Sequence, residues 1–282
     1  MSTFPPWFQE ICQRLQAADV SLENLNLNIR RMDEEMMQAL ANSLVHSRSL
    51  RVLNLTSSVM NDPSALKPLF SQSMAPSLQI LHLNYNQIND DAILPLGHAL
   101  ATNQYLQEIH LDYNEISVIG ARSIAKGLEC NTSLRVLQMN YNHIQTKGLV
   151  ALAQAMKRNT TLHQLGLRCN GIRSIEHFVD LLLHHNETLS ILSLEDNTPV
   201  AEYEDDERTT MRIMRKDQQA LLATANVYCR FNQAGRRIAH QAILPQLIAP
   251  VVDPSVVYLF LQTHLFRNSF HATSSKSSAA SS

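Results

Sequence analysis

His82 and His110 stand 28 residues apart, and each is followed two residues later by a polar side chain, Asn84 and Asp112. Two imidazoles and a carboxylate are side chains that bind zinc. No additional strong ligand accompanies them, so a metal site competes with a simpler interpretation. We favour the simpler one, in which these residues belong to a polar surface that contacts a partner.

Three tyrosines share this spacing, at Tyr85, Tyr113 and Tyr141. Tyrosine supplies a large, rigid contact area with a polar tip, which suits protein recognition. The alternative is that the rings only cover the ends of structural elements. The patterns of covalent catalysis are missing, since neither a G-x-S-x-G sequence, a phosphate loop nor a Cys-His arrangement can be placed. We therefore expect a protein that is not an enzyme and carries no cofactor or metal.

The 28-residue spacing belongs to an internal repeat, the feature that decides the fold. The pattern L-x-x-L-x-L begins at regular steps of 28 residues, with a last step of 27, at Leu22, Leu50, Leu78, Leu106, Leu134, Leu162 and Leu189. The alternation of leucines predicts a short strand with one apolar face. The remainder of each unit has helical spacing, as in Leu149, Leu152 and Met156.

A single strand and helix cannot bury their apolar faces alone, so the units must stack. We predict an α/β leucine-rich-repeat solenoid, a horseshoe with parallel strands on its concave side and helices on its convex side. Equivalent residues of adjacent strands then stand about 5 Å apart, with neighbouring imidazoles side by side rather than converging on a metal. The predicted binding residues on the concave surface are His82, Asn84, Tyr85, His110, Asp112, Tyr113, Gln138, Asn140, Tyr141 and Arg168.

An asparagine follows the pattern in five units, at Asn86, Asn114, Asn142, Asn170 and Asn197, where Arg30 and Ser58 occupy the first two units. Its amide can bond the backbone of the neighbouring turn, which predicts a structural ladder. Gly120 and Gly148 come where the convex helices begin, and we expect them in turns that need an unusual backbone angle.

The units resemble ribonuclease-inhibitor-type leucine-rich repeats, most clearly in LQEIHLDYNEISVIGARSIAKGLECNTS, and the resemblance covers residues 22–197. It implies a protein-binding concave surface and no shared catalytic residue. Relatives of this type include inhibitors, innate-immune sensor tails and the GTPase-activating protein of Ran. A small-GTPase activator is therefore the alternative function, although seven units are fewer than that type usually carries. The stretch NQAGRR followed by DPSVVYLFLQTHLF resembles the C-terminal parts of uncharacterised algal repeat proteins.

The organisation expected from these patterns has four parts. Residues 1–21 form a helical cap with Trp7, Phe8, Ile11 and Leu15 on one side, and residues 22–197 form the solenoid of about seven units. Residues 198–268 form an acidic linker and a helical extension, and 269–282 form a disordered tail. Pro63, Pro68 and Pro76 predict that the second unit replaces its helix by a loop and a short helical turn.

The charge is divided along the chain. Residues 1–207 hold 14 Lys or Arg against 23 Asp or Glu, whereas residues 208–282 hold 9 against 2. Aromatic residues do not alternate with the basic ones, which argues against nucleic acid. The four cysteines lack metal-type spacing, and neither a signal peptide nor a membrane span is visible. We expect a cytoplasmic protein, or a nuclear one, that works as a scaffold or adaptor for a protein partner of unknown identity, with an oligomeric state that the sequence leaves open.

Overall fold

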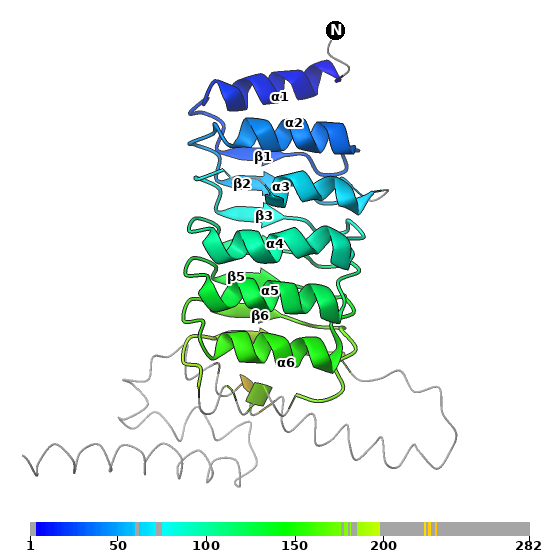
Figure 1. The fold of residues 1–282 in the computed structure, drawn as a ribbon, viewed down its shortest axis with the longest axis vertical. Coiled ribbons are helices and arrows are strands. Elements are labelled where there is room, and N and C mark those ends of the chain that lie inside the picture. Colours follow the sequence, from blue (N-terminus) through cyan, green and yellow to red (C-terminus); the bar gives the residue numbers. More distant parts are fainter. Residues whose placement is uncertain are drawn as a thin grey trace, which may run out of the picture.

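Seven short parallel strands form one sheet, in which each strand lies beside the strand that precedes it in the sequence (Figure 1). The computed structural model describes residues 4–59, 62–71, 75–175, 178–179, 181 and 185–197, and the single positions 223, 225, 226 and 229. Each strand pairs with the equivalent residues of the next unit, for example Leu81 with Ile109. The strands are β1 (Asn24–Asn26), β2 (Val52–Asn54), β3 (Ile80–His82), β4 (Glu108–His110), β5 (Val136–Gln138), β6 (Gln164–Gly166) and β7 (Ile191–Ser193).

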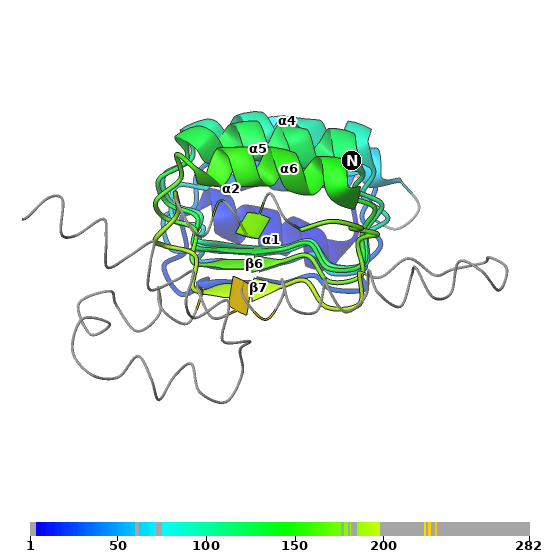
Figure 2. The same ribbon diagram turned by 90° about the horizontal axis from the view of Figure 1, so that it is seen from below.

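The helices form a second layer on one side of this sheet, as the view along the stack shows (Figure 2). The layer contains α2 (Glu34–Leu44), α3 (Lys67–Ser71), α4 (Asp90–Thr102), α5 (Val118–Cys130) and α6 (Gln145–Met156), while α1 (Pro6–Gln16) lies across the N-terminal end of the stack. In the second unit a 3-10 turn at Pro63–Leu66 precedes the short α3, which confirms the loop and helical turn expected from its prolines. No helix in the described part of the chain is long and apolar enough to span a membrane.

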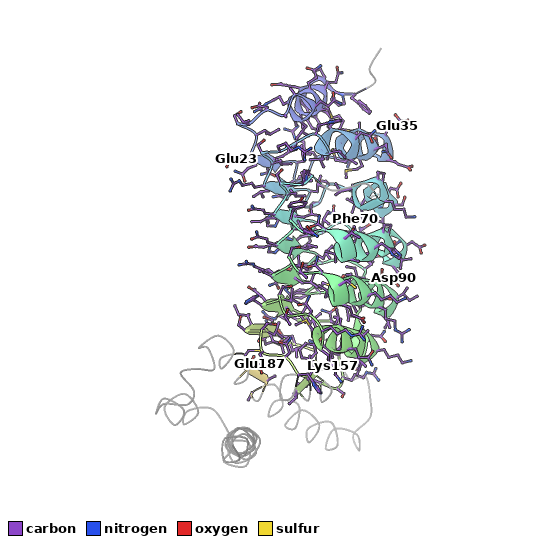
Figure 3. The ribbon with its side chains drawn as sticks, turned by 60° about the vertical axis from the view of Figure 1, so that its left-hand side comes forward. Glu23, Glu35, Phe70, Asp90, Lys157 and Glu187 are labelled. Carbon is purple, nitrogen blue, oxygen red and sulfur yellow. The ribbon has the colours of Figure 1, made fainter. Side chains whose placement is uncertain are left out.

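The core lies between the two layers and is built from the leucines of the repeat. The second leucine of each pattern is almost completely buried in the middle units, as at Leu53, Leu81 and Leu137. Burying one such side chain contributes about 1.5–3 kcal/mol, and only the stacking of neighbours makes that burial possible. The α/β solenoid predicted from the repeat is confirmed, with strands and helices on opposite sides (Figure 3).

Buried asparagines flank the strands, on both sides of β5, β6 and β7 and only after β3 and β4. After the strands, the predicted ladder is present: Asn114 Oδ1 accepts from the backbone N–H groups of Asn86 and Ile88, at 3.0 Å each. Before the strands runs a second ladder that the sequence analysis missed, in which Asn131 Nδ2 donates to the Leu100 carbonyl at 2.7 Å. The signal for it was the recurring pattern N-x-(S/T)-L, which begins at Asn131, Asn159 and Asn186.

The expectation that Gly120 and Gly148 sit in turns with an unusual backbone angle is wrong. Both lie inside helices, and among the described glycines only Gly171 has a positive φ, +68°. They are needed because neighbouring units approach closely. A Cβ at Gly120 would lie 2.7 Å from Asp90 Oδ1, and one at Gly148 would lie 3.1 Å from the Cβ of Ala121.

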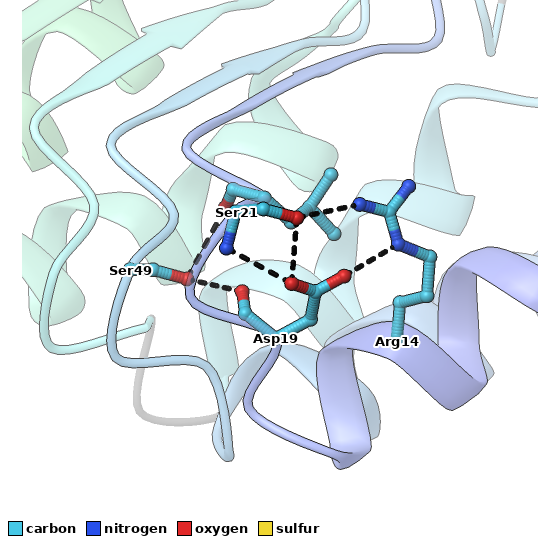
Figure 4. A network of polar contacts seen from close by, with 5 residues as sticks. Arg14, Asp19, Ser21 and Ser49 are labelled. Atoms are coloured by element: carbon cyan, nitrogen blue, oxygen red, sulfur yellow. Dashed lines mark hydrogen bonds and ion pairs between the residues drawn. The ribbon is translucent and has the colours of Figure 1, made fainter.

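At the N-terminal end, α1 covers the first unit. Phe8 and Leu15 are buried, with Trp7 and Ile11 packed partly against the core. A polar network joins α1 to β1: the Asp19 carboxylate accepts from Arg14 Nε at 2.7 Å and from the Ser21 backbone at 2.9 Å, while Ser49 Oγ donates to the Asp19 carbonyl (Figure 4). These contacts tie the cap to the solenoid.

Near the C-terminal end, Ala225 and Cys229 are buried in the same core, and burial raises the pKa of the Cys229 thiol to about 12. All four cysteines are free thiols. Apart from residues 223, 225, 226 and 229, the acidic linker and helical extension expected over 198–268 and the tail expected over 269–282 lie outside the described residues.

Candidate functional site

Tyr85, Tyr113 and Tyr141 occupy the turn that directly follows β3, β4 and β5. Their φ angles are 58°, 57° and 56°, in the left-handed region that L-residues with side chains seldom adopt. The rings stack face to face, with centroids 4.3 Å apart between Tyr85 and Tyr113 and 4.1 Å apart between Tyr113 and Tyr141. We call these three residues the Tyr row.

The stack determines what the Tyr row presents to a partner. Both faces of the Tyr113 ring are covered by its neighbours, so the accessible parts are the ring edges and hydroxyls. The residues remain 46%, 41% and 37% exposed in chain order. Partial burial and a hydrogen bond donated to Tyr113 raise the pKa of Tyr85, while a hydrogen bond donated to Tyr141 raises the pKa of Tyr113.

His82 and His110 lie side by side at the ends of β3 and β4. Their rings stack with centroids 4.5 Å apart and an interplanar angle of 26°. Partial burial, followed by the charge of His110, lowers the pKa of His82, so its neutral form is favoured. His110 Nε2 lies 3.5 Å from Glu108 Oε2. Within the described ranges no three His, Cys, Asp or Glu side chains are grouped to hold a metal ion.

The column of Asn84, Asp112 and Asn140 has a structural role that the sequence analysis did not identify. Asn84 Oδ1 accepts from the Asp112 backbone N–H at 2.8 Å, and Asp112 Oδ1 accepts from that of Asn140 at 2.7 Å. Asn140 Oδ1 accepts from the backbone N–H of Arg168 at 2.9 Å. This outer ladder runs along the strand ends beside the buried one. Its signal was an Asn or Asp two residues before each ladder asparagine in these units.

Two predicted binding residues have internal partners. Gln138 Oε1 accepts from Asn140 Nδ2 at 3.0 Å and lies over Gly166, where a Cβ would collide with it. Arg168 donates from Nε and Nη2 to Asp196 Oδ2, at 2.8 Å and 2.5 Å. The other five predicted residues thus hold parts of the solenoid together by hydrogen bonds, which leaves the two histidines and the Tyr row as the better candidates for contact with a partner.

Partly exposed apolar residues, which the sequence analysis left out, occupy the first position of four strands beside the histidines, and Glu108 and Gln164 interrupt them in β4 and β6. Val52, Ile80 and Val136 are half-buried, and Ile191 is 42% exposed. They occupy the first residue of their strands, so their side chains lie on the same face as the histidines two residues later. We call the face formed by these apolar residues, the histidines, the outer ladder and the Tyr row the strand surface.

Comparison with known proteins supports the repeat. The family described as Leucine Rich repeat matches residues 75–97, 102–125 and 130–153. No curated protein matches the chain.

Among solved structures, the tropomodulin C-terminal domain from Caenorhabditis elegans is 15% identical with a TM-score of 0.42, and the match covers 74% of this chain and 98% of that one. The actin-binding site 2 of leiomodin-1 is also 15% identical, with a TM-score of 0.36 and coverage of 84% and 98%. An internalin from Listeria monocytogenes gives 15% identity, a TM-score of 0.32 and coverage of 66% and 73%. The repeat pattern, the family match and the seven parallel strands together make this chain a leucine-rich-repeat solenoid.

Proposed function

We propose that this protein is a non-enzymatic scaffold or adaptor that binds a protein partner on its strand surface. We place it with the ribonuclease-inhibitor-type repeats, as its unit sequence suggests, and in the cytoplasm or the nucleus. The Tyr row is the observation that carries the proposal. It is a continuous row of stacked aromatic rings, partly exposed, on the same strand surface as the half-buried Val52, Ile80 and Val136.

The turn itself does not require tyrosine. Ser57, Cys169 and Asp196 occupy the same position in other units, with φ of 54°, 52° and 57°. A small or polar side chain therefore satisfies this backbone conformation, and the three rings add surface that the fold does not need. Tyrosines of this kind are enriched among the residues that dominate protein interfaces, because they bury much area with few rotatable bonds.

The test replaces the Tyr row by serine, the residue that already stands at the equivalent position 57. Tyr105 is the matched control, because it is 49% exposed but lies between α4 and β4, before the strands instead of after them. Partners are captured from native cells on the wild-type chain and on the two variants, identified by mass spectrometry, and their affinities are then measured with purified proteins.

We expect at least one partner that binds the wild-type chain and Tyr105→Ser equally. Its affinity for the Tyr85→Ser/Tyr113→Ser/Tyr141→Ser variant should be lower by about a hundredfold or more, since interface tyrosines commonly contribute above 1 kcal/mol each. Circular dichroism checks that the variant is folded. Undiminished affinity of every captured partner for the folded triple variant would refute binding at the strand surface.

A further inference from the structure

Asp112 belongs to the outer ladder, but its role in the ladder does not require its negative charge. Asn84, Asp112 and Asn140 each accept a backbone N–H of the next unit through one side-chain oxygen, over 2.8 Å, 2.7 Å and 2.9 Å. An amide oxygen performs this task in the units before and after Asp112. A carboxylate in the middle of the column is therefore not required by the ladder.

The carboxylate is also unfavourable for the fold. Asp112 is half-buried, and desolvation is the main cause that raises its pKa, against the lowering effect of its hydrogen bonds from Asn140. Both of those bonds, from the backbone and the side chain of Asn140, end on Oδ1. The other oxygen, Oδ2, accepts no hydrogen bond from the described residues and remains accessible to solvent.

No Lys or Arg among the described residues forms an ion pair with this group. Arg168, the basic residue two units along the same column, is paired with Asp196. A partly desolvated carboxylate without a cation is an incomplete pair. Opposite charges on a partner complete such pairs and give an interface its specificity.

The surroundings of Asp112 are suited to a long cationic side chain. His110, the last residue of β4, lies two residues before Asp112, and Tyr113 of the Tyr row directly follows it. The carboxylate is thus placed between the stacked histidines and the Tyr row, whose rings can contact the aliphatic stem of a lysine or arginine.

We infer that the strand surface recognises a basic segment of its protein partner, with one Lys or Arg side chain pairing with Asp112 between the histidines and the Tyr row. This inference rests on the proposed function and narrows it to a chemical class of partner. In this arrangement the outer ladder holds neighbouring units together, the Tyr row provides contact area for the partner, and Asp112 selects a positive charge on the partner.

The experiment is a selection from a random peptide library displayed on phage, carried out in parallel on the whole wild-type chain and on variants. Asp112→Asn removes the charge and keeps the ladder, because asparagine already does this work at positions 84 and 140. Asp91→Asn is the control, since it removes an equal charge from an exposed site at the start of α4, on the helix side. Asn84→Asp combined with Asp112→Asn returns a carboxylate to the column one unit away.

The wild-type chain and Asp91→Asn should enrich peptides with Lys or Arg at one fixed position, and these peptides should bind Asp112→Asn about tenfold or more weakly. The double variant should again enrich a basic residue. Unfolding by urea should show that Asp112→Asn is at least as stable as wild type. This follows because a pKa raised in the folded state means that the charged form is disfavoured there, a cost present above the folded pKa and relieved as pH falls through it.

Two failures are distinguishable. Selected peptides that lose binding in the Tyr row variant but carry no basic residue, or bind Asp112→Asn equally well, would overturn the assignment of Asp112 and leave the scaffold function intact. Peptides whose binding ignores both the Tyr row and Asp112 would overturn the strand surface as the binding site altogether.

Discussion

At the scale of single residues, the same side-chain type has different meanings according to the column in which it stands. Asn114 is almost completely buried and uses all of its amide in backbone hydrogen bonds, whereas Asn84 stands in the outer ladder and accepts one bond from the next unit. Asn131 carries a glycosylation-type triplet, yet its amide is buried and bonded to backbone carbonyls. Burial and partner, rather than residue type, decide what an asparagine contributes.

Asn114→Ala should lower the free energy of unfolding by about 2–4 kcal/mol, because it leaves two buried N–H groups and their carbonyl neighbours without partners. Asn84→Ala, which frees one partly exposed N–H, should cost about 1 kcal/mol or less. Urea denaturation followed by circular dichroism measures both. Equal losses for the two variants would contradict the division into a buried and an outer ladder.

At the scale of elements, the solenoid depends on how its first unit is closed. An uncovered first unit would expose its leucines, Leu22, Leu25 and Leu27, and the apolar side of α2 to water. Helix α1 prevents this through Phe8 and Leu15, and the Asp19 network of Figure 4 holds the connection to β1. The pKa of Asp19 is lowered from 3.8 to about 2 by its hydrogen bonds with Ser21 and Arg14.

Asp19→Ala should therefore lower the midpoint of thermal unfolding at neutral pH and increase tryptic cleavage after Arg14. A lowered pKa means that the carboxylate stabilises the fold above its unfolded value and loses this effect as pH falls through about 2. The difference between variant and wild type should thus shrink in acid. A Glu10→Ala change, at an exposed site on α1, is the control. A difference that persists unchanged below pH 2 would argue against the ionised network.

At the scale of the whole molecule, the distance between units is limited by how closely the helices approach. A Cβ at Gly127 in α5 would collide with the carbonyl oxygen of Gly97 in α4, and one at Gly97 would collide with Ser123. The backbones of α4 and α5 are therefore almost in contact. The glycines make this spacing possible, and the spacing sets how the strands in the opposite layer present the Tyr row.

Gly127→Ala should destabilise the protein by about 1–3 kcal/mol through overpacking, although alanine is the better helix former by about 1 kcal/mol. Lys126→Ala, at an exposed site of the same helix, should change stability by less than about 0.5 kcal/mol. Thermal and urea unfolding of the two variants tests this. A Gly127→Ala protein more stable than wild type would show that propensity outweighs the close approach.

The repeat pattern by itself determined the architecture. Leucines at fixed 28-residue steps specify which residues are buried, because a strand-helix unit has only one way to hide its apolar face, against its copies. The same periodicity predicts that the two histidines, and the three tyrosines of the Tyr row, are neighbours, and their rings do stack. The buried asparagine ladder followed from the same pattern.

Only the tertiary structure decided how the polar residues divide between fold and function. Asn84, Asp112 and Asn140 were predicted to bind a partner, and they form the outer ladder. The sequence cannot separate these two roles, because it does not show which side-chain oxygen accepts a backbone N–H of the next unit. The glycines were misread for a related reason: their role depends on the distance between α4, α5 and α6, a property of packed helices and not of a single unit. The structure alone shows that the ladder does not need the charge of Asp112, because the neutral amides of Asn84 and Asn140 accept the same backbone hydrogen bond.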